Sequence, residues 1–503
     1  MSGADGPPAV ARARTFALEA VAVWGLFVGY SLLQATVPGV NETHYLSKSR
    51  HLWQPEWCEG DVFLESSNPH LVFYRTVGWL AAVTDFEAAA VAMRLACLVV
   101  LAGGWVTLSG LVTRRSGVGV LSAATFLLMS TLGNWSGEWV VGGAESKVPS
   151  YGFGLAAVGL LAAGRVPWAG LSAGLSVAFH PVVGAWVTLA MAGAVLSDRR
   201  RFWRRTGVGS WAAAAVAWGV AAAAGIWPAL DALGGTPEES IAAARYQVTR
   251  RLAHHLNPAR FEPRAYANML LLLTLSGVFW SLTSDPRRRR LLASAGAAAV
   301  FAAVGVAVGL SGDLDKSDWR VFLLKFYPFR LADALVPIAV CVLLADYAAA
   351  RLGKAGVAAA GLAAAAAAVL VPAHDRDSSR LSASDRADWV TTLRWVRENT
   401  PADAVLYATD TQWAVKWHAR REEYANYKDC PQDPASLAEW RRRRGVLFRW
   451  SKAALADGAI SAEELRSLGE ETGITHLLSD RFGPLDVEPL FRAGRFRVTP
   501  TGV

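Results

Sequence analysis

The sequence predicts a polytopic α-helical membrane protein with roughly ten to twelve membrane segments and a small C-terminal α/β soluble domain. Of its 503 residues, 53% are hydrophobic and only 18% are charged, and the mean hydropathy is +0.26. Apolar runs of about 20 residues, the length that crosses a bilayer as a helix, recur as far as position 372. From position 373 the composition becomes that of a soluble protein. We therefore expect a multi-span part, 1–372, and an outer domain, 373–503.

The predicted spans are apolar runs bounded by charged residues, glycine or proline. They cover residues 16–35, 88–112, 117–133, 148–164, 208–230, 267–284, 291–312, 331–347 and 355–372. The stretch 167–196 is too long for one span, and Pro181 interrupts it. Because an internal proline breaks or kinks a helix, we expect two short helices there, forming a hairpin around His180.

Clusters of basic residues orient this topology. They are Arg12/Arg14, Arg114/Arg115, Arg165, 199–201, 287–290 and Arg351/Lys354. The positive-inside rule predicts that these clusters face the cytoplasm. All of them can lie on that one side of the membrane only if the stretch 167–196 crosses twice, as a hairpin. The N-terminus is then cytoplasmic and the C-terminal domain extracytoplasmic. These clusters explain most of the net charge of +8, so the charge does not call for a nucleic-acid partner.

The first outward segment, 38–87, is crowded with side chains that can do chemistry. Glu42 and His44 lie at its start, and Asp61 and His70 follow. A tether between two spans needs only a few polar residues, so this acidic segment predicts a reaction site at the membrane surface. For any single acid, the alternative is a solvated side chain that caps a loop. The apolar run 71–83 predicts a helix lying on the membrane.

The second outward segment, 134–147, adds Glu138, Glu145 and Lys147. Together with the first segment it supplies carboxylates that could act on a substrate or hold a divalent cation. His180, at the turn of the predicted hairpin, is either a substrate contact or a buried imidazole with its hydrogen bonds satisfied.

The third and fourth outward segments, 231–263 and 313–330, are basic instead. They contain Arg251, the pair His254-His255, and Arg330 at the start of a span. Basic residues outside run against the topological bias, so they need a local reason. One reason is an anionic ligand such as a lipid-linked phosphate, which arginine binds through its fork of donors. The alternative is an amphipathic helix whose arginines touch the headgroups of ordinary membrane lipids.

The C-terminal region alternates short helices and strands. Helices are expected at 384–398, 434–444 and 461–468, and strands at 404–409 and 475–479. This pattern favours a small α/β domain. Cys58 and Cys430 would both face the oxidising side and could pair, although a sequence alone cannot fix the connectivity.

In the order of its motifs, the chain resembles the class C (GT-C) membrane glycosyltransferase superfamily, whose members use polyprenyl-phosphate-linked sugars. That family carries an acidic residue or pair after the first span, and here Asn41 stands in place of the first acid and Glu42 in place of the second. The run 326–330 resembles the family's basic-aromatic entry into a late span, and 395–404 resembles the opening of its soluble tail. Segments 53–70, 254–258 and 426–440 resemble more closely an uncharacterised planctomycete-type family of polytopic bacterial membrane proteins.

The resemblance implies an enzyme of the bacterial inner membrane that moves a sugar from a polyprenyl-phosphate donor to an envelope acceptor outside. Glu42 would be the acceptor base, or a metal or sugar ligand, assisted by Asp61 and Glu145. The lipid phosphate would be held by Lys147, Arg251 and Arg330. His44, His70, His180, His254 and His255 would complete the substrate site. Two rival hypotheses remain: a transporter or flippase of a polar or lipid-linked substrate, and a non-catalytic member of the same fold.

Overall fold

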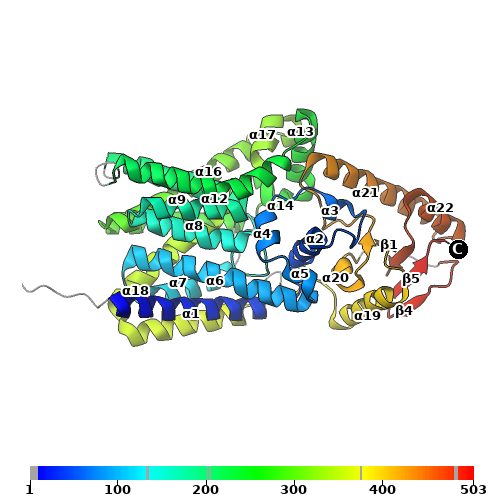
Figure 1. The fold of residues 1–503 in the computed structure, drawn as a ribbon, viewed down its shortest axis with the longest axis horizontal. Coiled ribbons are helices and arrows are strands. Elements are labelled where there is room, and N and C mark those ends of the chain that lie inside the picture. Colours follow the sequence, from blue (N-terminus) through cyan, green and yellow to red (C-terminus); the bar gives the residue numbers. More distant parts are fainter. Residues whose placement is uncertain are drawn as a thin grey trace, which may run out of the picture.

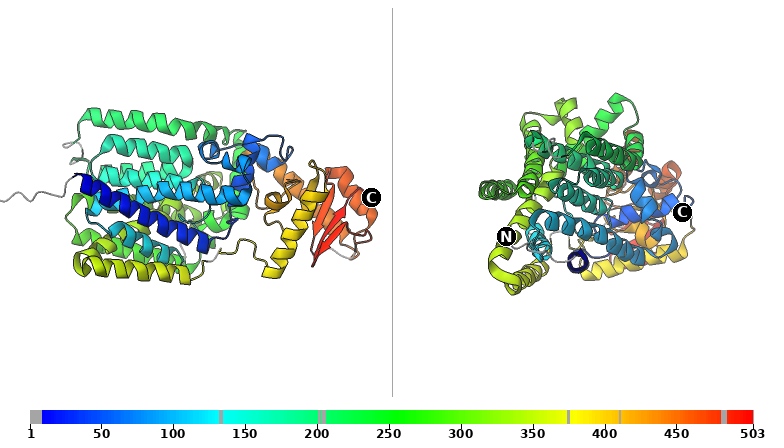
Figure 2. Two further views of the ribbon diagram at one scale, coloured as in Figure 1. Left: turned by 60° about the horizontal axis from the view of Figure 1, so that its bottom comes forward. Right: turned by 60° about the vertical axis from the view of Figure 1, so that its left-hand side comes forward.

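A computed structural model describes residues 9–131, 135–200, 202, 206–373, 376–409, 411–480 and 485–502. Long helices run side by side in a bundle, and a domain with a small sheet stands at one end of that bundle (Figure 1). A view turned about the long axis shows the same two parts (Figure 2). The predicted fold class is confirmed in this form, as a mostly helical chain with a small C-terminal sheet.

Ten apolar helices among the described residues form the bundle. They are α1 (Ala9–Gln34), α6 (Phe86–Thr113), α7 (Val118–Thr131), α8 (Lys147–Ala162), α9 (Val166–Phe179), α10 (Pro181–Ser197), α12 (Val208–Asp231), α15 (Pro263–Leu282), α16 (Pro286–Leu310) and α18 (Arg330–Leu370). Six of them, α1, α6, α12, α15, α16 and α18, are long and apolar enough to cross a membrane, which indicates a membrane protein. Helix α18 holds two of the predicted spans and is kinked between them at Gly353, where φ is 65°.

The predicted hairpin is present. Helix α9 ends at Phe179 and α10 begins at Pro181, with His180 in an extended conformation between them. The single helix expected at 71–83 is wrong, because the chain forms two short helices there, α4 (Leu71–Thr76) and α5 (Leu80–Val83). The turn between them packs so tightly that a Cβ atom at Gly78 would lie 2.5 Å from the carbonyl oxygen of Tyr74.

Basic residues lie at the ends of several helices of the bundle: Arg114 and Arg115 follow α6, Arg165 precedes α9, and Arg287 lies in the first turn of α16. Two arginines there bind one buried acid: Arg115 Nη1 lies 2.9 Å and Arg288 Nη2 2.7 Å from the carboxylate of Asp346. Arg290 lies 3.7 Å from Asp198 at the end of α10. The predicted basic clusters 114–115 and 287–290 therefore meet at Asp346. The assignment of their side to the cytoplasm stays a prediction.

Helices α6 and α8 cross at glycines. A Cβ atom added at Gly104 would lie 1.8 Å from the carbonyl oxygen of Gly152, whereas one added at Gly103 would meet nothing within 4 Å. Small residues allow two membrane helices to bring their backbones this close.

Gly104→Ala should therefore lower the free energy of unfolding by about 1–3 kcal/mol, because the methyl group must push two backbones apart. Gly103→Ala is the matched control: it should be neutral or stabilising by up to about 1 kcal/mol, since alanine favours a helix over glycine. Thermal unfolding of the purified protein in detergent measures both. Equal stability of the two variants would contradict the close crossing.

The C-terminal domain places helices on both faces of a five-stranded sheet. Its elements are α19 (Ala383–Asn399), β1 (Val405–Ala408), α20 (Val415–Ala419), β2 (Glu422–Glu423), α21 (Pro434–Ala454), α22 (Ala462–Thr472), β3 (His476–Ser479), β4 (Phe491–Ala493) and β5 (Phe496–Pro500). The strand order is β2-β1-β3-β5-β4; β1 is parallel to β2 and β3, and β5 is antiparallel to β3 and β4.

Alternating residues of the central strands pack into two separate hydrophobic cores, one on each face of the sheet. Leu406 and Leu478 belong to the core of α19, whereas Tyr407 and Leu477 belong to that of α21 and α22. Neighbouring side chains on a strand point to opposite faces, so this division follows from the sheet itself. The helix predicted from position 384 is α19, and its N-cap is Ser382, which accepts a hydrogen bond from the Asp385 amide.

The outward segments of the bundle gather against this domain. Helices α2 (Glu42–Trp53), α3 (Val62–Glu65) and α14 (Ala253–Leu256) lie between the bundle and the sheet (Figure 1). Cys58 and Cys430, which could have paired, are both free thiols.

Candidate active site between the bundle and the C-terminal domain

Five polar side chains from four segments meet where the bundle faces the C-terminal domain. We call them the interfacial cluster: Glu138, Glu145, Lys147, His180 and Arg330. Four of them are at most 7% exposed, and the Arg330 side chain is 15% exposed. They come from the loop before α8, the first residue of α8, the turn between α9 and α10, and the first residue of α18. The structure thus brings together residues that lie as far apart as 192 positions in the chain.

Ion pairs connect the cluster. Lys147 Nζ lies 3.4 Å from Glu138 Oε1 and 3.4 Å from Glu145 Oε2. Arg330 Nε lies 3.0 Å from Glu138 Oε2, and its Nη1 lies 3.2 Å from His180 Nε2. Two carboxylates therefore balance one ammonium and one guanidinium group, which is a condition for keeping such charges buried.

Glu145 is the carboxylate of the cluster that has a buried oxygen available for a further hydrogen bond. Its Oε1 atom is buried and has no hydrogen-bond partner among the described residues. Burial raises the pKa of Glu145, although Lys147 and a hydrogen bond with Asn41 act in the opposite direction. A carboxylate of raised basicity with a free oxygen suits a general base or a ligand for substrate. Asn41, the neighbour of Glu42 in the chain, thus contacts Glu145.

The loop that carries Glu138 is held from two sides. Asp333, one turn into α18, accepts hydrogen bonds from the Trp135 amide at 2.7 Å and the Ser136 amide at 2.6 Å. On the other side, His255 Nδ1 lies 2.6 Å from the Ser136 carbonyl oxygen. Burial lowers the pKa of His255 to about 3, so its imidazole is neutral and supports the loop as a hydrogen-bond partner.

Aromatic rings and histidines form a wall beside the cluster. The rings of His70 and His180 are 4.6 Å apart, and Tyr45 stacks on His70 at 5.8 Å. Burial, with Arg330 and Lys48 nearby, lowers the pKa of His70 to about 3. His44 packs against Tyr45, with ring centroids 5.1 Å apart, and burial also lowers its pKa. The Nδ1 atoms of His44 and His70 have no hydrogen-bond partner among the described residues.

Glu42 is buried and fully bound. Its two oxygens lie 2.6 and 2.7 Å from the Arg94 guanidinium nitrogens, and they also accept hydrogen bonds from the backbone amides of Gly39 and Ala144. The side chain is 0% exposed. These contacts favour a positioning role, because Glu42 fixes the residue that precedes Glu145. A role as acceptor base stays a prediction.

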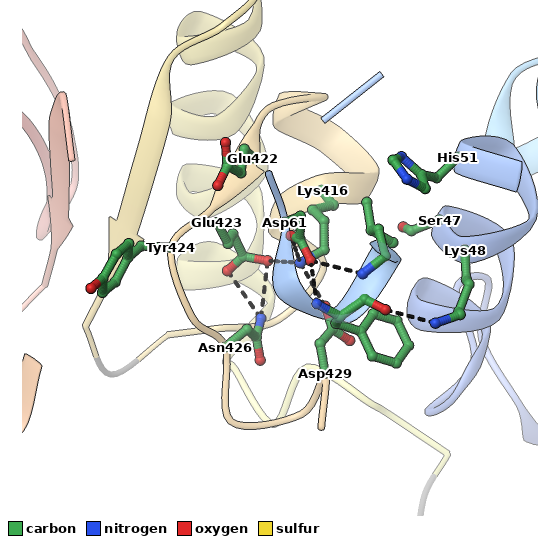
Figure 3. Close-up of polar contacts among 12 residues, drawn as sticks. Ser47, Lys48, His51, Asp61, Lys416, Glu422, Glu423, Tyr424, Asn426 and Asp429 are labelled. Carbon is green, nitrogen blue, oxygen red and sulfur yellow. Dashed lines mark hydrogen bonds and ion pairs between the residues drawn. The ribbon is translucent and has the colours of Figure 1, made fainter. Parts of the chain in front are cut away.

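Asp61 lies at the junction with the C-terminal domain, away from the interfacial cluster. It caps α3 by accepting hydrogen bonds from the Phe63 and Leu64 amides. Its other oxygen lies 2.7 Å from Lys416 Nζ. Figure 3 shows Asp61 beside Lys416. Lys416 is 4% exposed and also contacts Asp429 at 2.8 Å and Glu423 at 3.2 Å. These four residues form the junction network, which ties the first outward segment to the tail.

Two further residues complete the surroundings of this network (Figure 3). Asn426 donates its side-chain amide to both oxygens of Glu423, whose pKa burial raises to about 7. Lys48 donates to the carbonyl oxygens of Phe63 and Ser66 at 2.7 and 3.0 Å, and burial lowers its pKa to about 7.

Arg251 also turns toward the C-terminal domain. It donates to the carbonyl oxygens of Tyr427 and Lys428, both at 3.1 Å, and its guanidinium lies 4.6 Å from the Tyr427 ring. His254 stacks on its neighbour His255 with ring centroids 4.0 Å apart. Among the described residues, no three His, Cys, Asp or Glu side chains are arranged to hold a metal ion.

The predicted site residues therefore separate into three groups. Glu145, Lys147, His180 and Arg330 lie in the interfacial cluster, with His44, His70 and His255 around it. Glu42 lies outside the cluster, but it accepts a hydrogen bond from the amide of Ala144, the residue before Glu145. Asp61 and Arg251 belong to the contact with the C-terminal domain.

Sequence reasoning missed two partners, Arg94 and Lys416. Arg94 had a signal: it is a single arginine within the apolar run 88–112, and a charge inside a membrane helix needs a buried partner. No pattern linked Lys416 to Asp61, because the two residues lie 355 positions apart in the chain.

Comparisons with known proteins give a partial match. A family model described as a domain of unknown function (DUF6798) matches residues 387–447, which include Lys416, Glu423 and Asp429 of the junction network. No curated protein matches the chain. Among solved structures, the chain is similar to an oligosaccharyltransferase from Archaeoglobus fulgidus, crystallised with zinc and sulfate, at 12% identity and a TM-score of 0.38. The match covers 93% of this chain and 68% of that one, and at this score it identifies neither a family nor a reaction.

Proposed function

We propose that this chain is a membrane glycosyltransferase of the bacterial inner membrane. It would move a sugar from a polyprenyl-phosphate-linked donor to an envelope acceptor on the extracytoplasmic side. The observation that carries the proposal is the interfacial cluster, in which Glu138, Glu145, Lys147 and Arg330 converge at the end of apolar helices. Such a place suits a substrate with a lipid tail and a charged, sugar-bearing head.

The cluster provides the groups that this chemistry needs. Glu145, with a free oxygen and raised basicity, takes the proton of the acceptor hydroxyl or holds a divalent cation on the leaving phosphate. Lys147 and Arg330 bind the phosphate, and Glu138 keeps both cations in place until it arrives. Glu42 and Arg94 position the segment that carries Glu145. Because the cluster is buried, the donor must displace part of its wall to enter.

Glu145→Gln tests the proposal. It removes the base but keeps the size of the side chain, so transfer should fall at least about 100-fold, the lower range for loss of a general base. Envelope glycans and lipid-linked sugars are measured by mass spectrometry in a deletion strain that carries the wild-type or the variant gene. The variant should accumulate a lipid-linked sugar and lack the corresponding glycan.

The matched control is Glu59→Gln, which changes an exposed acid of the first outward segment. It should restore the glycan fully, and both variants should reach the membrane in normal amounts. Full restoration by Glu145→Gln would refute the role of Glu145 as the base.

One observation favours a second candidate, a non-catalytic member of the same fold. Both oxygens of Glu42, the acid that the resemblance makes catalytic, are bound by Arg94 and two backbone amides. A deletion strain with unchanged glycans and lipid-linked sugars would support this candidate over the transferase.

A further inference from the structure

A cavity of about 700 Å³ lies between the first outward segment and the C-terminal domain, outside the interfacial cluster. We call it the junction cavity. Its walls come from α2, the loop after it, the start of α6, the end of α19 and the residues after α20, elements that lie together in Figure 1. The size is in the range of sites that enclose a small molecule.

The lining of the junction cavity carries more positive than negative charge. Five arginines line it: Arg50, Arg394, Arg397, Arg420 and Arg421. The acids that line it are Glu56, Asp85 and Glu87. Among the described residues, none of the five guanidinium groups forms an ion pair of 4.0 Å or less with a carboxylate. The cavity's own acids Glu87 and Asp85 act on Arg420 from a greater distance and raise its pKa, against the larger effect of burial.

Two of these arginines have buried N–H donors for which the described residues supply no hydrogen-bond acceptor. Arg50 Nε, and Arg420 Nε and Nη1, are buried and lack hydrogen-bond partners among the described residues. Burial together with the neighbouring arginines lowers the pKa of Arg50 and lowers that of Arg420 to about 10. Unsatisfied buried donors are costly, and an anion is the ligand that satisfies them.

An unusual backbone conformation places Arg420 at the cavity. Its φ is 57°, in the left-handed region that residues other than glycine rarely adopt. Its neighbour Arg421 anchors this turn by donating to the carbonyl oxygens of Arg397, Thr400 and Arg420. The Arg420 guanidinium then lies 3.8 Å from the centre of the Phe86 ring, and Arg50 lies 5.6 Å from the same ring on α6.

We propose that the junction cavity binds a phosphate or pyrophosphate group of a ligand, held by Arg50 and Arg420 with Arg394 and Arg397 at the rim. Guanidinium forks match the oxygens of a phosphate, and several forks around one cavity favour a multiply charged anion. Trp57 and the Trp417 side chain, whose indole donates to Glu87, supply flat apolar walls for the rest of the ligand. The site does not depend on the proposed transfer reaction.

Binding is tested with the purified full chain in detergent. Sodium pyrophosphate is titrated at constant ionic strength while the fluorescence of the tryptophans is followed, and sodium sulfate serves as the comparison anion. We expect saturable binding of pyrophosphate that weakens at least about tenfold in the Arg50→Gln/Arg420→Gln variant, through the loss of two charged donors. The control Arg492→Gln, an exposed arginine on the outer strand β4, should bind as the wild type does.

A second arm separates a soluble ligand from a lipid. Native mass spectrometry of the chain, reconstituted with a polyprenyl phosphate or with neutral lipid, reports whether the lipid phosphate occupies the site and is lost in the double variant. Binding of pyrophosphate alone indicates a soluble phosphorylated ligand, and binding of the lipid alone indicates a headgroup. Binding of neither, or equal binding by the double variant, overturns the proposal. If the double variant unfolds at a lower temperature than the wild type, the single variant Arg50→Gln takes its place.

Discussion

Arg94→Met should lower the free energy of unfolding by about 3–5 kcal/mol, because it leaves the Glu42 carboxylate buried without its cation. The pair is 1% and 0% exposed, so solvent does not screen the charge that remains. The loss extends beyond the pair, since Arg94 also donates to the carbonyl oxygens of Ser31, Ala35 and Thr36 at the end of α1. Thermal unfolding in detergent measures the effect.

A double-mutant cycle separates the ion pair from simple packing. The variant Arg94→Met/Glu42→Leu removes both charges and should be more stable than Arg94→Met alone, with a coupling energy above about 1 kcal/mol. Arg75→Met, which changes an exposed arginine of α4, is the control and should leave stability unchanged within about 0.5 kcal/mol. Additive losses in the cycle would mean that the two side chains do not act as a pair.

The ion pair of Arg94 and Glu42 also supports the segment that carries Glu145. Ala144 donates its amide to Glu42, and Glu145 is the next residue. Glu42→Gln should therefore reduce transfer together with stability. Glu145→Gln should reduce transfer far more than stability, because Lys147 keeps its ion pair with Glu138. This difference distinguishes a positioning residue from a catalytic one.

The membrane helices could be predicted from the sequence because each one is a local pattern. A run of apolar residues long enough to cross the bilayer is visible in one window, and Pro181 marks the hairpin by its missing amide. The helix expected at 71–83 failed for a reason that is not local. Gly78 brings its turn against Ser49 of α2, where a Cβ atom would lie 2.6 Å from the hydroxyl oxygen, so packing overrides the helical pattern.

The site was predicted in part because its residue types were suitable, but their pairing depends on the tertiary fold. The sequence singled out Glu145, Lys147 and Arg330, which do meet. It also singled out Asp61, whose partner Lys416 lies 355 residues away, with no pattern that links the two. A carboxylate can therefore be assigned a catalytic or a structural role only once the folded structure shows which cation it contacts.

Lys416→Met should have the second large effect, a loss of about 3–5 kcal/mol in the stability of the C-terminal domain and its junction with the bundle. The Lys416 ammonium group lies within 3.2 Å of Asp61, Glu423 and Asp429, so its removal leaves three buried carboxylates facing one another. Limited proteolysis of the tail and thermal unfolding both report the loss. Lys452→Met, an exposed lysine on α21, is the control and should behave as the wild type.

The pH dependence shows whether charge repulsion causes this loss. Burial already raises the pKa of Glu423 to about 7 while Lys416 acts to lower it, so the variant should raise it further. An acid whose pKa is higher in the folded than in the unfolded state destabilises the fold above that pKa, and the cost disappears as the pH falls toward the unfolded value. The deficit of Lys416→Met relative to the wild type should therefore shrink when the pH is lowered from about 8 to about 5. A deficit that is constant with pH would instead indicate lost packing around the lysine chain, and the junction network would then hold the domain by shape rather than by charge.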